Sequence, residues 1–126
     1  MTAQPSFQSL AAAVFLTVFT ASESPGHGAY HDLVDKITTE LKTNPDDAVL
    51  HYKLAEAHAG HEEWQVCLVE IDRVERQAPG IHPTGYLRGL ALLIGGKYEQ
   101  AKDTLDGFLS AHPTHTEALA TRGRVF

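Results

Sequence analysis

Residues 64–79 read WQVCLVEIDRVERQAP, and residues 98–113 read YEQAKDTLDGFLSAHP. The two stretches lie 34 positions apart, and their alignment pairs residues of similar size and role: Trp64 with Tyr98, Ile71 with Leu105 and Pro79 with Pro113. A period of this length is typical of stacked helix-turn-helix units, each of which buries its apolar side only against its neighbours. The sequence therefore predicts an all-α fold made of antiparallel helix pairs.

The same register predicts where helices begin and end over most of the chain. Apolar residues recur at spacings of three and four, and Gly or Pro residues separate the runs. The pattern predicts six helices: one over residues 30–42, a second that follows Asp46 or Asp47 and ends near residue 59, and four more over 62–77, 84–94, 98–111 and 116–126. Asp46 or Asp47 is placed to cap the second helix, and Glu62 and Glu63 are expected in the first turn of the third.

Two complete units follow from this register, at residues 48–81 and 82–115. Residues 25–47 form a degenerate half unit, and residues 116–126 supply the front helix of an incomplete or capping unit. An internal unit without a cap exposes an apolar face. Three alternatives therefore remain for the apolar residues Val125 and Phe126. The last helix is itself the cap, the chain continues in a longer protein, or a second copy of the chain covers this end and forms a homo-oligomer.

The spacing of small residues resembles that of the tetratricopeptide repeat (TPR) family. Ala55, Gly89 and Gly123 match the small residue of the family's front helix, while Leu33, Cys67 and Ala101 stand at the small position of its back helix. The resemblance implies a short right-handed α-solenoid whose concave groove binds partner proteins. Departures from the family pattern are the large Leu33, Arg88 in place of the leucine seen at Leu54, and Gly85 in place of a bulky aromatic residue.

Front-helix residues are expected to line that groove, and they point to a protein or peptide partner with an apolar stripe. They are Val49, Tyr52 and Glu56 in the first unit, Pro83, Tyr86, Leu90 and Leu93 in the second, and Glu117, Ala120 and Arg124 beyond. This lining is more apolar and aromatic than charged, unlike the basic lining with which family members hold an acidic peptide tail. The alternative is that Tyr52, Tyr86 and Leu93 simply pack against the neighbouring repeat.

Composition argues against several other classes of function. The net charge is −6 and only ten Lys and Arg residues are present, whereas nucleic acid and acidic lipid surfaces require a basic face. The sequence holds no phosphate-binding glycine loop, nucleophile elbow or zinc-protease helix, so we expect no enzyme activity and no cofactor. The single Cys67 falls on a packing position and is expected to be a buried structural thiol.

Residues 1–24 begin with an uncharged stretch whose apolar run, from Leu10 to Ala21, suits a signal peptide. The run is too short to span a membrane, which takes roughly 20 residues. A signal peptide would make this an exported bacterial protein, periplasmic or secreted, with no stable membrane span after processing. No Lys or Arg precedes Leu10, so the alternative is a hydrophobic N-terminal helix that packs on the domain of a cytoplasmic protein.

Eight His residues suggest a different class of function, an exported protein that binds copper or zinc. The candidate ligands are His27 and His31, four residues apart. Gly26 and Gly28 argue against a continuous helix there, and no third ligand stands at a matching position. The paired His residues of the chain are therefore expected to be solvated loop side chains, and we predict no metal site; the pairs are His27 and His31, His58 and His61, and His112 and His115.

Overall fold

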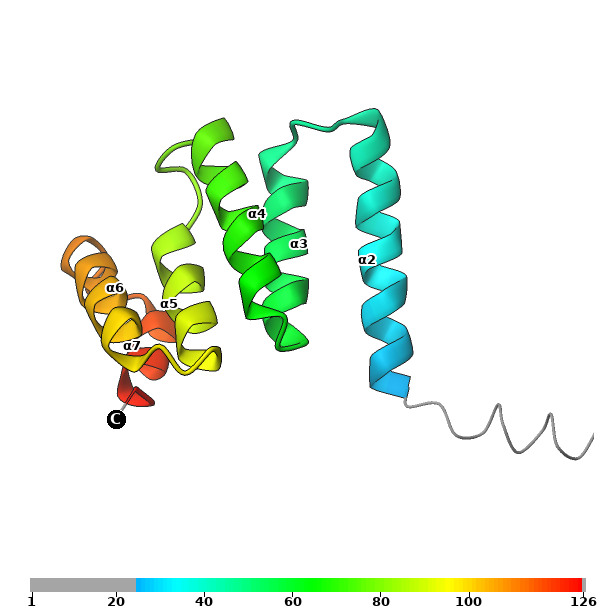
Figure 1. Ribbon diagram of the computed structural model, residues 1–126. Coiled ribbons are helices and arrows are strands. Elements are labelled where there is room, and N and C mark those ends of the chain that lie inside the picture. The colour runs from blue at the N-terminus through cyan, green and yellow to red at the C-terminus, as the bar shows by residue number, and fades with distance from the viewer. Residues whose placement is uncertain (1–24, 126) are drawn as a thin grey trace, which may run out of the picture. The chain divides into compact units, whose positions relative to one another are not determined.

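The computed structural model describes residues 25–125, which form helices and no strand (Figure 1). For Pro25, Gly26 and His27 it describes the backbone alone. The helices are α2 (Pro25–Thr43), α3 (Ala48–Gly60), α4 (Trp64–Gln77), α5 (Thr84–Ile94), α6 (Tyr98–Ala111) and α7 (Thr116–Gly123). The all-α prediction is confirmed. The segment expected to be a signal peptide or hydrophobic helix, residues 1–24, lies outside the described residues, as does Phe126.

Residues 33–126 form one compact unit, and the preceding residues belong to a separate one. Of the separate unit, the described part is the beginning of α2, where the rings of Tyr30 and His31 lie 5.3 Å apart. None of the helices described here combines the length and the apolar character needed to cross a bilayer.

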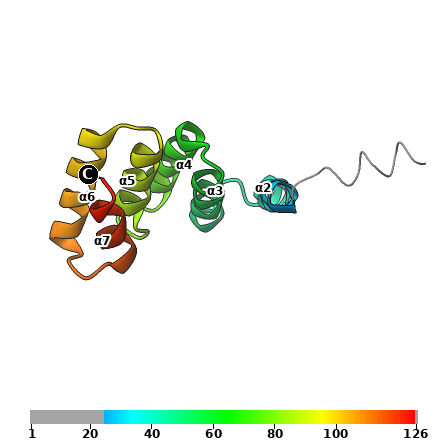
Figure 2. The ribbon, with the colours of Figure 1, turned by 90° about the horizontal axis from the view of Figure 1, so that it is seen from below.

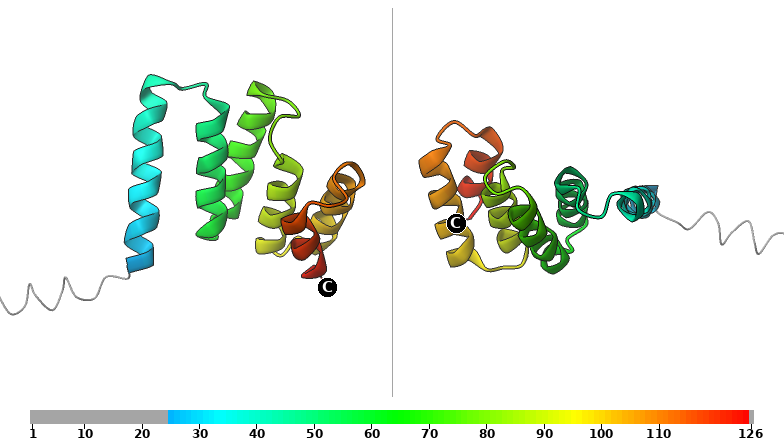
Figure 3. Two further views of the ribbon diagram at one scale, coloured as in Figure 1. Left: turned by 180° about the vertical axis from the view of Figure 1, so that it is seen from behind. Right: turned by 90° about the horizontal axis from the view of Figure 1, so that it is seen from above.

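Within residues 33–126, consecutive helices pack against each other as the period of 34 requires. Helices α3 and α4 form one antiparallel pair and α5 and α6 the next, and α5 lies between α4 and α6 (Figures 2 and 3). The front helices α3, α5 and α7 contact one another in sequence, whereas no Cα atoms of the back helices α4 and α6 come within 8 Å. The front helices are therefore on the inner side of the stack.

Small residues let these helices approach closely in the core. A Cβ atom added to Gly89 would lie 2.5 Å from the side chain of Leu105, which is fully buried. A Cβ added to Gly85 would lie 2.9 Å from Phe108, so an aromatic residue at this position has no room. Cys67 is buried, as predicted, and its burial raises the pKa of the thiol to about 12.

Ion pairs repeat with the same period. Arg88 on α5 lies 2.9 Å from Asp72 on α4, and Arg122 on α7 lies 2.6 Å from Asp106 on α6. The side chain of Arg122 also lowers the pKa of Asp106 by donating a hydrogen bond to it. Each ion pair therefore joins a back helix to the front helix of the next unit.

Helix boundaries follow the predictions where local signals set them. Asp47 caps α3 by accepting hydrogen bonds from the backbone nitrogen atoms of Val49, at 2.9 Å, and Leu50, at 3.2 Å. Glu62 was wrongly expected in the first turn of α4. Its φ of 63° is left-handed, so it belongs to the turn, and α4 begins after Glu63.

The two outer helices also differ from the prediction. α2 begins at Pro25 rather than at Tyr30, because proline is well tolerated in the first turn of a helix and Gly28 is accommodated within it. α7 ends at Gly123, and the chain then turns so that Val125 is buried in the core with Leu105 and other residues. Val125 is therefore part of the packed domain rather than of an exposed helix.

Candidate partner-binding face

Three successive front helices place the predicted groove residues on one side. Tyr52 and Glu56 come from α3, Tyr86 from α5, and Glu117 and Arg124 from α7 or its end. We call these five residues the front-helix face. The tyrosines are half-buried and the other three side chains are exposed.

Apolar packing explains part of the predicted set. Tyr52, Tyr86 and Leu90 pack against the core cluster of Ala55 and its neighbours, and Leu93 packs against the cluster that contains Leu92 and Leu105. Val49 stands exposed at the start of α3. Tyr52, Tyr86 and Leu93 therefore do pack against the core, as the alternative expected, although each tyrosine keeps part of its surface in contact with solvent.

Each tyrosine also contacts a histidine that comes from the segment before the next front helix. The rings of Tyr52 and His82 stack with centroids 5.2 Å apart, and those of Tyr86 and His115 lie 5.1 Å apart. His115 caps α7 as well, because its Nδ1 accepts a hydrogen bond from the backbone nitrogen of Ala118 at 3.1 Å. The expectation that His115 is a solvated loop side chain is therefore wrong, because it serves as both a cap and a packing residue.

The acidic and tyrosyl groups of the front-helix face lie close enough to shift one another's pKa. Although Glu56 is exposed to solvent, its partial desolvation by neighbouring atoms raises its pKa most; the charge of Glu117 raises the pKa further, and Lys53 opposes this rise. Burial, Glu56, Tyr86 and Glu117 all raise the pKa of Tyr52.

Tyr86 belongs to the same group. Burial raises its pKa most, followed by Glu117 and Glu56, while Arg124 and a hydrogen bond with Thr121 lower it. The face thus carries more acidic character than the sequence interpretation, which stressed its apolar residues, had assigned to it.

A buried polar pair that the sequence interpretation missed lies where α2, α3 and α4 meet. The Nδ1 of His51 is 2.6 Å from an oxygen of Glu70, and its Nε2 donates a hydrogen bond to the carbonyl oxygen of Pro45 at 2.8 Å. Since both nitrogen atoms face oxygen, a proton must lie between His51 and Glu70. The pair borders a cavity of about 340 Å³ and ties the turn before α3 to the two helices of the first repeat.

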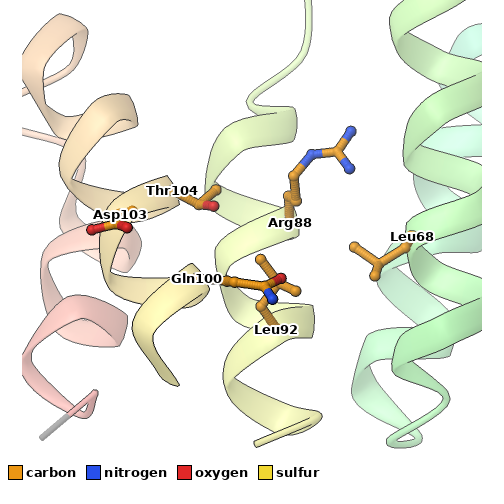
Figure 4. Close-up of a pocket in the computed structure, with 6 residues that line it drawn as sticks. All are labelled: Leu68, Arg88, Leu92, Gln100, Asp103 and Thr104. Atoms are coloured by element: carbon orange, nitrogen blue, oxygen red, sulfur yellow. The ribbon is translucent and has the colours of Figure 1, made fainter. Parts of the chain in front are cut away.

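A second cavity, of about 400 Å³, lies on the back-helix side between α4, α5 and α6 (Figure 4). Its lining mixes apolar and polar side chains: Leu68, Arg88, Leu92, Gln100, Asp103 and Thr104. The guanidinium of Arg88 is already paired with Asp72. The cavity therefore presents no unpaired positive charge from Arg88 to an anionic ligand.

The candidate metal ligands His27 and His31 lie in one continuous helix, so the argument from Gly26 and Gly28 is wrong. The side chain of His27 is outside the described residues. Among the side chains that the structure describes, no three His, Cys, Asp or Glu residues come together to hold a metal ion.

Comparison with models of known protein families gives no match for this chain, and comparison with curated proteins gives none.

Proposed function

We propose that this protein is a TPR-like interaction scaffold without catalytic activity, and that its front-helix face binds a segment of a partner protein. One observation carries the proposal: the contacting front helices α3, α5 and α7 bring two half-buried tyrosines, Tyr52 and Tyr86, together with the exposed carboxylates of Glu56 and Glu117. Burial raises the pKa of both tyrosines most, and the two carboxylates accordingly raise it further. Tyrosine is enriched at the centre of protein-binding surfaces, and polar, solvent-accessible residues form the rim around that centre.

The chemistry of the face indicates what the partner segment carries. Exposed ring edges suit an apolar or aromatic side chain. Glu56 and Glu117 repel each other, and a Lys or Arg side chain between them would replace that repulsion by attraction and would lie close to the tyrosine rings. We therefore propose a partner segment that combines an apolar stripe with at least one basic residue, rather than an acidic tail.

The test is capture of partners by the purified chain and its variants. Tyr52→Ala combined with Leu90→Ala should abolish capture, and Glu117→Lys should weaken it by reversing one charge of the acid pair. Asp103→Lys is the matched control, because Asp103 is an exposed acid on the back helix α6. Helical content by circular dichroism must be unchanged in each variant.

The charge variants separate the two parts of this proposal. If Tyr52→Ala/Leu90→Ala leaves capture intact, the binding face lies elsewhere. If that variant abolishes capture while Glu117→Lys and Asp103→Lys behave alike, the face is correct and the basic partner is wrong.

A further inference from the structure

The cavity that His51 and Glu70 border lies near the turn between α2 and α3, within the compact unit of residues 33–126. Its volume is about 340 Å³, and Leu41, Pro45 and Leu54 supply apolar surface to its lining. Pockets for small organic molecules have volumes of roughly 300–1,000 Å³, apolar walls and a few polar groups that converge on the ligand. The cavity is therefore large enough for such a ligand, and none of its lining residues belongs to the front-helix face.

Two basic residues, Lys42 of α2 and Arg73 of α4, also line this cavity, and both are exposed to solvent. Neither forms an ion pair or a hydrogen bond with another residue that the structure describes. The larger cavity between α4, α5 and α6 differs in this respect, because its Arg88 is paired with Asp72. Of the two cavities, the one beside α2 is therefore the better place for an anion.

The buried pair in the wall adds no net charge to this site. Glu70 is 7% exposed and His51 is 3% exposed. His51 keeps one proton on Nε2 for the carbonyl of Pro45, and a second proton lies between Nδ1 and Glu70. Whether that second proton belongs to the imidazole or to the carboxyl group, the charges of the pair sum to zero. The positive charges of Lys42 and Arg73 are therefore not cancelled by Glu70.

We infer that this cavity binds a small organic acid, with its carboxylate held by Arg73 and Lys42 and its apolar part against Leu41 and Leu54. A guanidinium can hold a carboxylate through two parallel hydrogen bonds, and an ammonium adds a compact positive charge. An amine of the same size would instead be repelled by both side chains. Because the two cations come from α2 and α4, the bound acid links these helices and stabilises the end of α2 against the first repeat.

The test is titration of the full chain with hexanoate, followed through its backbone amide signals by NMR. Hexanoate should shift the signals of the lining residues to saturation, whereas hexylamine should not. Lys42→Glu and Arg73→Glu should each weaken hexanoate binding by about tenfold or more, because repulsion replaces a charge-assisted contact. Arg76→Glu is the matched control: Arg76 is an exposed arginine on the same helix, outside the cavity lining, and its replacement changes the net charge equally.

Binding of hexanoate by Arg76→Glu as by the unmodified chain, together with its loss in the other two variants, would support the site. Absence of saturable shifts at the lining residues with millimolar hexanoate would overturn it. Equal binding of hexylamine, or equal weakening in Arg73→Glu and Arg76→Glu, would also overturn it, because the two cations would then have no specific role. Tighter binding of hexyl phosphate than of hexanoate would overturn the choice of a carboxylate. Circular dichroism checks that every variant keeps its helical content.

Discussion

His51 and Glu70 form a buried pair, and replacing His51 by Ala should lower the free energy of unfolding more than replacing Glu70 by Ala. His51→Ala leaves the buried Glu70 without its partner and also removes the part-buried hydrogen bond to the carbonyl of Pro45. Removal of one member of a buried ion pair costs about 3–5 kcal/mol. Glu70→Ala costs less, about 1–3 kcal/mol, because a neutral His51 still donates its Nε2 proton to Pro45.

The assay is urea unfolding followed by circular dichroism at neutral pH, with the exposed Gln100→Ala as control. The double variant should cost less than the sum of the single ones, with a coupling of about 0.5–3 kcal/mol, because it leaves no unpaired carboxylate. A total stability of roughly 5–15 kcal/mol makes the loss in His51→Ala a large fraction of the whole. Equal losses in the two single variants, or strict additivity, would refute the assignment of a shared proton between His51 and Glu70.

Three further variants probe packing, capping and charge. Gly89→Ala should lower the free energy of unfolding in urea by about 1–3 kcal/mol, because its Cβ would meet the buried Leu105. Gly107→Ala, with open space around the added Cβ, should instead raise the free energy of unfolding by up to about 1 kcal/mol. Equal effects of the two substitutions would contradict the packing argument. Asp47→Ala should cost about 1 kcal/mol by removing the cap of α3, and an unchanged midpoint would contradict the cap. The raised pKa of Glu56 means that its carboxylate binds a proton more tightly in the folded state than in the unfolded state. The stability of the fold should therefore fall as the pH rises from the ordinary pKa of 4.5 through the higher pKa of the folded state. Glu56→Gln should therefore raise the thermal midpoint at pH 7 and leave it nearly unchanged below pH 4.5; a pH-independent effect would count against the coupling.

Local signals explain how much of the fold could be predicted from the sequence. The bounds of α5 and α6 agree with the prediction because glycine, proline and the apolar period set them within a few residues. The turn at Glu62 was missed because a left-handed conformation is uncommon in a residue that is not glycine.

Features that depend on tertiary contact could not be predicted in the same way. His51 and Glu70 are 19 residues apart and on different helices, and neither residue type signals burial by itself. The contacts of His82 and His115 with tyrosines likewise arise only after the helices have stacked. For the front-helix face, the period identified the residues, while the mutual influence of Glu56 and Glu117 required the structure.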